Sequence, residues 1–88
     1  MWAVEWDDAA RKELRKLDHS AQNQIIRYLD DRIATEEDPR RFGEGLTGDK
    51  AGLWRYRVGD YRVICRIEDQ NLVVLILRVG HRRNVYES

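Results

Sequence analysis

Four arginines lie on two neighbouring segments at a spacing that places them on one face of a β-hairpin. Residues 53–58 and 61–68 alternate between apolar and polar side chains, and Gly59-Asp60 between them has the composition of a two-residue turn. This turn sets a register in which Arg57 lies opposite Arg62. Because successive side chains of a strand point to opposite faces, one face is expected to carry four guanidinium groups. We call it the arginine face; it comprises Arg55, Arg57, Arg62 and Arg66.

The chemistry of the arginine face suits a phosphate group. A guanidinium is a rigid fork that donates two parallel hydrogen bonds to phosphate oxygens. Like charges directly opposite each other destabilise a sheet by up to about 1 kcal/mol, so Arg57 across from Arg62 requires an anion that offsets the repulsion. A strand that only needs to be soluble mixes both signs of charge, whereas this face has no carboxylate before Glu68. We therefore predict an anion site here.

The charge of the whole chain excludes a protein that coats nucleic acid by bulk charge. Sixteen Lys plus Arg against sixteen Asp plus Glu give a formal net charge of zero. The balance is uneven, because residues 53–88 hold seven arginines and four acids, whereas residues 1–52 hold nine basic and twelve acidic residues. Any anion site is therefore local and belongs to the second half of the chain.

The patterns around the hairpin predict one α+β domain, residues 1–88, with the element order βααβββ. Residues 1–6 alternate as a short strand, and a helix is expected from Asp7 or Asp8 to about Leu17. Ser20 is expected to cap a second helix that ends at Asp38-Pro39 and buries one face, formed by Ile25, Ile26, Leu29 and Ile33.

The second half of the chain predicts a sheet for these helices to cover. Residues 38–52 hold four of the six glycines and are expected to form a loop. Residues 69–71 provide a turn, and Leu72–Leu77 is apolar on both faces, as an interior strand is.

Cysteine and histidine content limits the kinds of site. The single cysteine, Cys65, excludes an internal disulfide, and two scattered histidines leave too few ligands for a closed zinc site. The longest apolar run is far shorter than the roughly 20 residues that cross a bilayer. We expect a cytoplasmic protein with no metal, no other cofactor and no membrane partner.

Two motifs carry a resemblance to a known family. GLWRYRVGDYRVICRI at 52–67 and VGHRRNVY at 79–86 are similar to the RelE branch of the RelE/ParE toxin superfamily, and the resemblance covers essentially the whole chain. It implies a type II toxin of RelE-like fold, with a helical hairpin packed on a twisted, largely antiparallel sheet. Many members continue into a C-terminal helix, whereas this chain stops two residues after Tyr86; we expect that helix to be absent and Tyr86 to be mobile.

The resemblance implies a ribosome-dependent endoribonuclease that cleaves messenger RNA in the A site without a metal. In RelE-type chemistry the ribose 2′-hydroxyl attacks the adjacent phosphate, giving a 2′,3′-cyclic phosphate and a 5′-hydroxyl. Arg55 and Arg57 occupy the places of two basic residues, often lysines, and Arg62 matches the arginine after the turn. Arg55 and Arg62 would clamp the pentacovalent phosphate, and Arg82 would protect or protonate the leaving oxygen.

Further residues of the motifs would hold the RNA. Tyr86 would stack on an unstacked base or assist proton transfer. Contacts with the RNA outside the cleaved phosphate are expected from Lys50, Arg66 and Arg83.

The general base is where the sequence departs from the family pattern. Arginine almost never loses its proton, so Arg57 is a poor substitute for a catalytic lysine. Histidine is the side chain suited to proton transfer near neutral pH, so His81, beside Arg82, is the expected replacement. Lys50 is a weaker candidate, and a third alternative is catalysis by positioning and charge without a full base.

The resemblance also implies partners: a RelB-like antitoxin, the 30S A site with its message, and operator DNA only through the antitoxin complex. Two other functions stay open. One is a ParE-like toxin that inhibits DNA gyrase by binding; the other is a binding-only member that survives as an antitoxin partner. The arginine face favours the nuclease, because a gyrase inhibitor needs no phosphate clamp.

Overall fold

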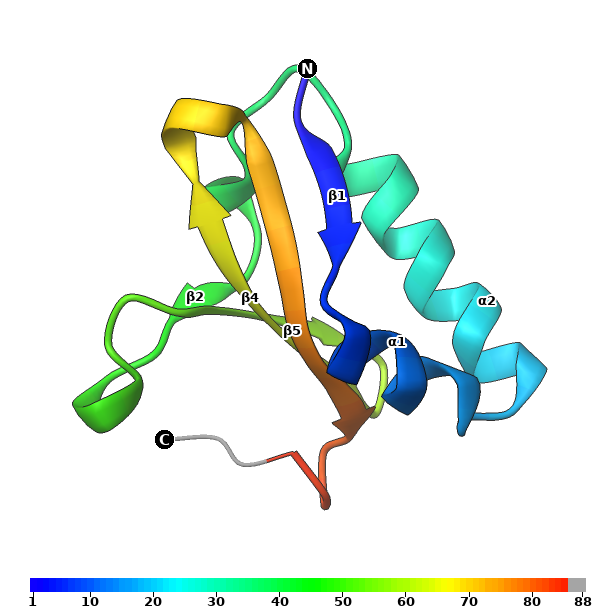
Figure 1. The fold of residues 1–88 in the computed structure, drawn as a ribbon. Helices are drawn as coiled ribbons and strands as arrows, with labels where there is room; N and C mark the ends of the chain where they lie inside the picture. Colours follow the sequence, from blue (N-terminus) through cyan, green and yellow to red (C-terminus); the bar gives the residue numbers. More distant parts are fainter. Residues whose placement is uncertain (86–88) are drawn as a thin grey trace.

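A computed structural model describes residues 1–85 and shows two helices on one face of a five-stranded sheet (Figure 1). The helices are α1 (Asp8–Arg15) and α2 (His19–Tyr28), and a π-helical turn, Leu29–Ile33, continues α2. The strands are β1 (Ala3–Trp6), β2 (Glu44–Gly45), β3 (Trp54–Val58), β4 (Tyr61–Glu68) and β5 (Val73–His81). Short 3₁₀ turns occupy Pro39–Arg41, Gly48–Lys50 and Asp69–Asn71. The predicted α+β class is confirmed.

The sheet has the order β1-β5-β4-β3-β2 and is mostly antiparallel. The exception is the pair of β1 and β5, which run parallel, with Ala3 opposite Val73 and Trp6 opposite Ile76. Figure 1 shows β5 between β1 and β4, so the predicted interior strand is confirmed. It begins one residue later than expected, because Leu72 adopts a left-handed backbone (φ 53°) at the preceding turn.

The hairpin of β3 and β4 has the predicted register. Arg57 lies opposite Arg62, Arg55 opposite Ile64 and Trp54 opposite Cys65. Gly59 at the turn has φ 59°, a conformation that costs glycine little. The two-residue turn thus decides which side chains reach the helices and which form the arginine face.

The second helix departs from prediction at its cap and at its end. Asp7 caps α1 as expected, but the carboxylate of Asp18, and not Ser20, accepts the Ala21 N–H at the start of α2 (2.8 Å). The helical segment ends at Ile33, five residues before Asp38. The π-helical turn explains this early end, because its wider winding brings Ala34 N–H to Leu29 O and closes the helix.

The core lies between the helices and the sheet. Its fully buried side chains include Ile25, Leu29, Ile33, Tyr56, Val63, Val74 and Ile76. Ile26, predicted on the buried face, is 40% exposed, because adjacent residues on a helix point about 100° apart and Ile25 already faces the sheet. Each fully buried aliphatic side chain contributes roughly 1.5–3 kcal/mol relative to exposure.

The expected loop at 38–52 contains a short strand. β2 pairs with β3, placing Glu44 opposite Arg55 and Gly45 opposite Trp54. Gly43 has φ 76°, and a Cβ there would lie 2.2 Å from the Arg55 carbonyl oxygen, so the backbones approach closely at this point. Trp54 Nε1 donates to Phe42 O (2.7 Å) and fixes the entry to β2.

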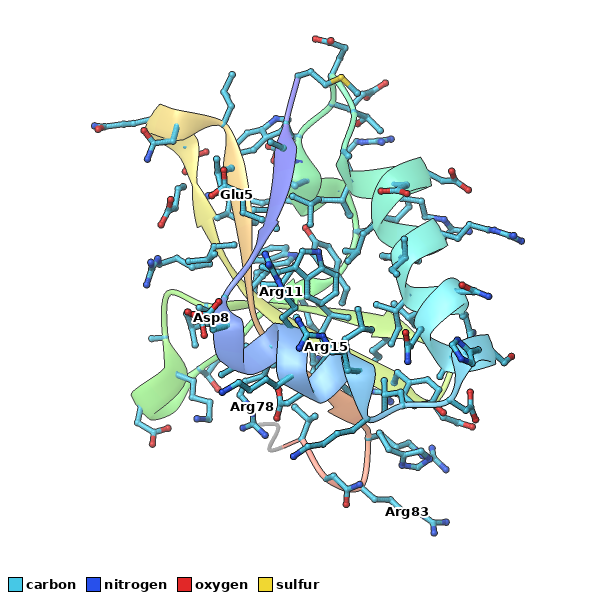
Figure 2. All side chains as sticks on the ribbon, turned by 45° about the vertical axis from the view of Figure 1, so that its right-hand side comes forward. Glu5, Asp8, Arg11, Arg15, Arg78 and Arg83 are labelled. Carbon is cyan, nitrogen blue, oxygen red and sulfur yellow. The ribbon has the colours of Figure 1, made fainter. Side chains whose placement is uncertain are left out.

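The C-terminal end of β5 contacts α1 and the residues that follow β5. Beyond β1, Glu13 of α1 accepts the Val79 N–H (2.9 Å) and pairs with Arg78; Figure 2 shows Arg78 beside α1. Residues 82–85 then turn back, and Val85 packs where a Cβ on Gly80 would be only 2.7 Å away. Within residues 1–85, no helix is long and apolar enough to cross a membrane.

Tyr56→Phe should lower the free energy of unfolding by about 1–3 kcal/mol, because the fully buried Tyr56 hydroxyl donates to the Pro39 carbonyl oxygen (2.7 Å), which would lose its donor. Urea denaturation measures the change. Tyr61→Phe is the matched control, since Tyr61 is only half-buried; equal losses in the two variants would contradict the assignment.

Candidate anion-binding site

The arginine face is not uniformly open to solvent. Arg55 and Arg62 are buried (7% and 8% exposed), whereas the Arg57 and Arg66 side chains are more than half exposed. The difference arises from a small apolar cluster on this side of the sheet. Ile64 lies directly opposite Arg55 and packs with Leu46 and Val85. The cluster therefore lies beside the buried Arg55, whereas Arg57 and Arg66 remain accessible.

Glu44 supplies a carboxylate that the sequence did not predict on this face. Its Oε1 pairs with Nη2 of Arg55 and lies 3.5 Å from Nη2 of Arg57. β2 places it there by pairing Glu44 with Arg55. The only sequence signal was an acidic residue between two glycines, Gly43 and Gly45, in a segment that otherwise predicts a loop. One carboxylate therefore bridges two neighbouring guanidinium groups.

The repulsion expected between Arg57 and Arg62 is relieved within the protein. Arg57 turns toward Glu44, while Arg62 Nη1 donates to the carbonyl oxygens of Gly59 (3.0 Å) and Tyr61 (2.9 Å). Arg62 thus helps to hold the hairpin turn as well as facing the site. The anion that the sequence requires for this pair is supplied by the protein itself, because β2 places Glu44 beside Arg57 and the turn supplies acceptors for Arg62.

Arg66 and the three predicted cations outside the arginine face take separate positions. Arg82 follows β5; its N–H donates to Asp60 O (2.7 Å), and its Nε lies 3.9 Å from an Asp60 carboxylate oxygen. Arg66 pairs with Glu68, at the far end of β4. Lys50 lines a small pocket with Leu53, Ile64 and Arg78. Arg83 projects from the end of the molecule in Figure 2.

His81 lies on the opposite face of the sheet from the arginines. It pairs with Tyr61, and directly opposed residues share a face, so both point to the side that carries Val63 and Val79. The ring contact agrees, with centroids of Tyr61 and His81 5.7 Å apart. His81 Nδ1 accepts the Arg83 N–H (3.2 Å). The structure therefore does not bring the expected general base to the arginine face. Tyr86, the last predicted site residue, lies outside the described residues.

The one cysteine takes no part in this site. Cys65 is buried in the core, and burial raises the pKa of its thiol to about 12. A thiol in this environment stays protonated and unreactive. Among residues 1–85, no group of three or more His, Cys, Asp or Glu side chains is arranged to hold a metal ion.

The arrangement can bind an anion and can accept a proton. Arg55 and Arg57 already share one carboxylate oxygen of Glu44, so two guanidinium groups are directed at a single anionic position. Glu44 is half exposed, so its carboxylate is accessible to a bound molecule.

A double-mutant cycle should separate the two ion pairs of Glu44. Glu44→Gln with Arg55→Met should show a coupling energy of about 1–3 kcal/mol, since the Arg55 partner is buried. The same cycle with Arg57→Met should give less than about 1 kcal/mol, because that pair is exposed. Urea denaturation gives all values; the reverse order would show that burial of Arg55 does not strengthen its pair.

Comparison with known proteins gives consistent matches. The model of the family described as ParE toxin of type II toxin-antitoxin system, parDE, matches residues 4–86. Toxin RelG of Mycobacterium tuberculosis is 33% identical over 85 residues, which cover 97% of this chain and 95% of that protein.

Solved structures agree with these sequence matches. The toxin-antitoxin complex RelBE2 from Mycobacterium tuberculosis superposes with a TM-score of 0.84 at 33% identity, covering 92% of this chain and 98% of that one. The archaeal RelE-RelB complex from Pyrococcus horikoshii OT3 gives a TM-score of 0.70 at 28% identity, covering 96% and 98%. The chain therefore belongs to the ParE toxin family of type II toxin-antitoxin systems, in the RelE branch of the RelE/ParE superfamily.

Proposed function

We propose that this toxin is a metal-independent endoribonuclease that cleaves messenger RNA in the ribosomal A site. The observation that carries the proposal is the pair formed by Arg55 and Arg57, which hold a single carboxylate between them on the arginine face. A scissile phosphate has the same charge sign and a similar oxygen geometry. The similarity to toxin RelG and to the RelE complex supports the same conclusion.

The cleavage step needs charge stabilisation at the phosphate. Attack by the ribose 2′-oxygen forms a new P–O bond and breaks the bond to the 5′-oxygen, and negative charge builds up on the phosphate between these events. Arg55 and Arg57, with Arg62 from the neighbouring strand, stabilise that charge. Arg82 contacts the leaving 5′-oxygen, which then takes a proton from water.

Glu44 is the residue that we assign as proton acceptor. A base for the 2′-hydroxyl must lie within hydrogen-bond reach of a group next to the bound phosphate. Glu44 contacts Arg55 and Arg57, whereas His81 lies on the other face. When phosphate displaces the carboxylate from Arg57, Glu44 stays beside the 2′-oxygen and takes its proton. Lys50, Arg66, Arg83 and Tyr86 hold the flanking RNA.

The partners follow from the same proposal. The ribosomal 30S A site presents the message, which compensates for the zero net charge of the chain. A RelB-like antitoxin neutralises the toxin in the cytoplasm, and operator DNA is bound only through that complex. Two similar structures are complexes with such antitoxins.

A second candidate function is inhibition of DNA gyrase by binding, without RNA cleavage. It is favoured by the family match, because the family that matches residues 4–86 is that of ParE toxins. The bridged arginine pair favours the nuclease, because binding to gyrase makes no use of a phosphate clamp.

Induced expression of the toxin should arrest growth and produce cuts in message at the A-site codon. Arg82→Ala should remove the cuts, because the exposed Arg82 side chain faces the leaving oxygen. Primer extension on message from induced cells reads the cuts. Arg11→Ala on the outer surface of α1 is the control (Figure 2). Intact transcripts accompanied by DNA breaks would instead establish the gyrase function.

Glu44→Gln should slow cleavage by about 10²–10⁴-fold while RNA still binds, because the amide fills the same space but accepts no proton. Single-turnover cleavage on programmed ribosomes measures the rate, and the slope of rate with pH should be lost in the variant. Glu68→Gln, which removes the carboxylate paired with Arg66, is the matched control. Full activity of Glu44→Gln would exclude Glu44 as the base.

A further inference from the structure

A groove of about 670 Å³ runs between α2 and the end of β3. The helical side contributes Arg27, Tyr28 and Arg32, and the hairpin contributes Arg57, Val58 and Gly59. One end is closed where α2 meets the hairpin turn, since a Cβ on Gly59 would lie 2.7 Å from Gln24 Nε2. The volume is in the range of about 300–1,000 Å³ that is typical of ligand sites.

The groove is cationic although the chain is neutral. Its lining carries three arginines and one acid, Asp31, which leaves two positive charges in excess. Clefts lined by one sign of charge concentrate the opposite sign of ligand. The arginines are Arg27, Arg32 and Arg57, and all three are exposed to solvent.

Arg32 is held in position before any ligand binds. Its guanidinium carbon lies 5.1 Å from the centre of the Tyr28 ring and 5.5 Å from that of Phe42. Arg32 lies within the π-helical turn Leu29–Ile33, whose wider winding sets the direction in which its side chain leaves the helix. An arginine that is already ordered loses less entropy on binding an anion.

The rest of the lining is polar and offers hydrogen bonds. Ser20, Asn23 and Gln24 form one wall. The apolar floor is small, since Val58 is only 4% exposed. An amphipathic protein helix would find little apolar surface to bury here, whereas a sugar-phosphate backbone would find donors along the whole wall.

Arg57 connects the groove to the arginine face. Its side chain lines the groove and also lies 3.5 Å from Glu44, the partner of Arg55. We propose that the groove binds the backbone of the messenger strand next to the cleaved phosphate, with Arg27 and Arg32 contacting phosphates and Arg57 at the junction. This inference rests on the proposed ribonuclease function, which supplies the strand and its position.

The test measures binding of a single-stranded RNA oligonucleotide that carries 2′-O-methyl groups and so cannot be cleaved. Fluorescence anisotropy with the full chain between about 50 and 200 mM salt gives the affinity and its salt dependence. Arg27→Glu should weaken binding about tenfold and make the salt dependence shallower, by about 0.7 in slope for each phosphate that the protein no longer neutralises. Arg27→Ala should have a smaller effect in the same direction.

Arg11→Glu on α1 is the matched control, with the same change of charge on a helix surface outside the groove (Figure 2). It should weaken binding less than twofold. Equal effects of Arg27→Glu and Arg11→Glu would overturn the proposal, since only overall charge would then matter. A loss of antitoxin binding by Arg27→Glu with unchanged RNA affinity would also overturn it and assign the groove to the antitoxin.

A crosslinking experiment distinguishes the proposal of an RNA groove from the proposal of a ribonuclease function. An oligonucleotide with 4-thiouridine next to the phosphate that the 2′-O-methyl group protects from cleavage should crosslink to the peptide that contains Asn23 and Arg27. That crosslink, combined with an absence of message cleavage in cells, would refute the nuclease function and retain an RNA groove. Cleavage in cells with crosslinks only to other segments would refute the groove alone.

Discussion

The two-residue turn at Gly59-Asp60 is the constraint on which the rest of the structure depends. It fixes the register of β3 against β4 and thereby decides which side chains enter the core. Its carbonyl oxygens accept hydrogen bonds from the Arg62 guanidinium and the Arg82 N–H. Gly59 also allows α2 to approach, because no side chain blocks Gln24. Site, core and groove therefore meet at one turn.

Charge compensation in this toxin is local. Arg55 and Arg57 share Glu44, Arg78 pairs with Glu13, and Arg40 forms two hydrogen bonds to Asp69. The last pair holds the pKa of the Asp69 carboxyl below its usual value, chiefly through those hydrogen bonds. Its contribution to stability is therefore present above the ordinary pKa of aspartate and declines as pH falls through the lowered one. Because these acids are paired at other places, the groove beside α2 keeps an excess of arginines although the net charge of the chain is zero.

Much of the fold followed from local patterns, and the errors came from long-range contacts. The hairpin register was predictable because Gly59-Asp60 leaves only one pairing of its flanks. Asp18 and Ser20 are both good caps, and the local pattern does not distinguish the residue that the structure uses, Asp18. β2 has two residues and no hydrophobic alternation, so nothing in its own sequence distinguishes it from a loop.

The candidate site likewise combines features set by local pattern with features set by long-range contacts. The face of the four arginines was predictable from strand alternation, but the burial of Arg55 depends on Leu46 and Val85, which come from distant segments. Glu44 reaches the site because it lies on β2, a strand that the sequence does not predict. The proximity of His81 to Arg82 in the sequence suggested a shared site, but His81 is the last residue of β5 and points with Tyr61 to the other face of the sheet.

The pairing of β1 with β5 has a consequence for the synthesis of the protein. Ala3 lies opposite Val73, and β1 is an edge strand, so β1 has no neighbour in the sheet until β5 has been made. Contacts between residues so far apart in sequence form slowly and late in folding. β5, an interior strand of the sheet, and with it part of the floor of the core, is therefore absent until the chain has been made as far as His81. The sheet of this toxin consequently assembles only after both helices and the hairpin of β3 and β4 have been synthesised.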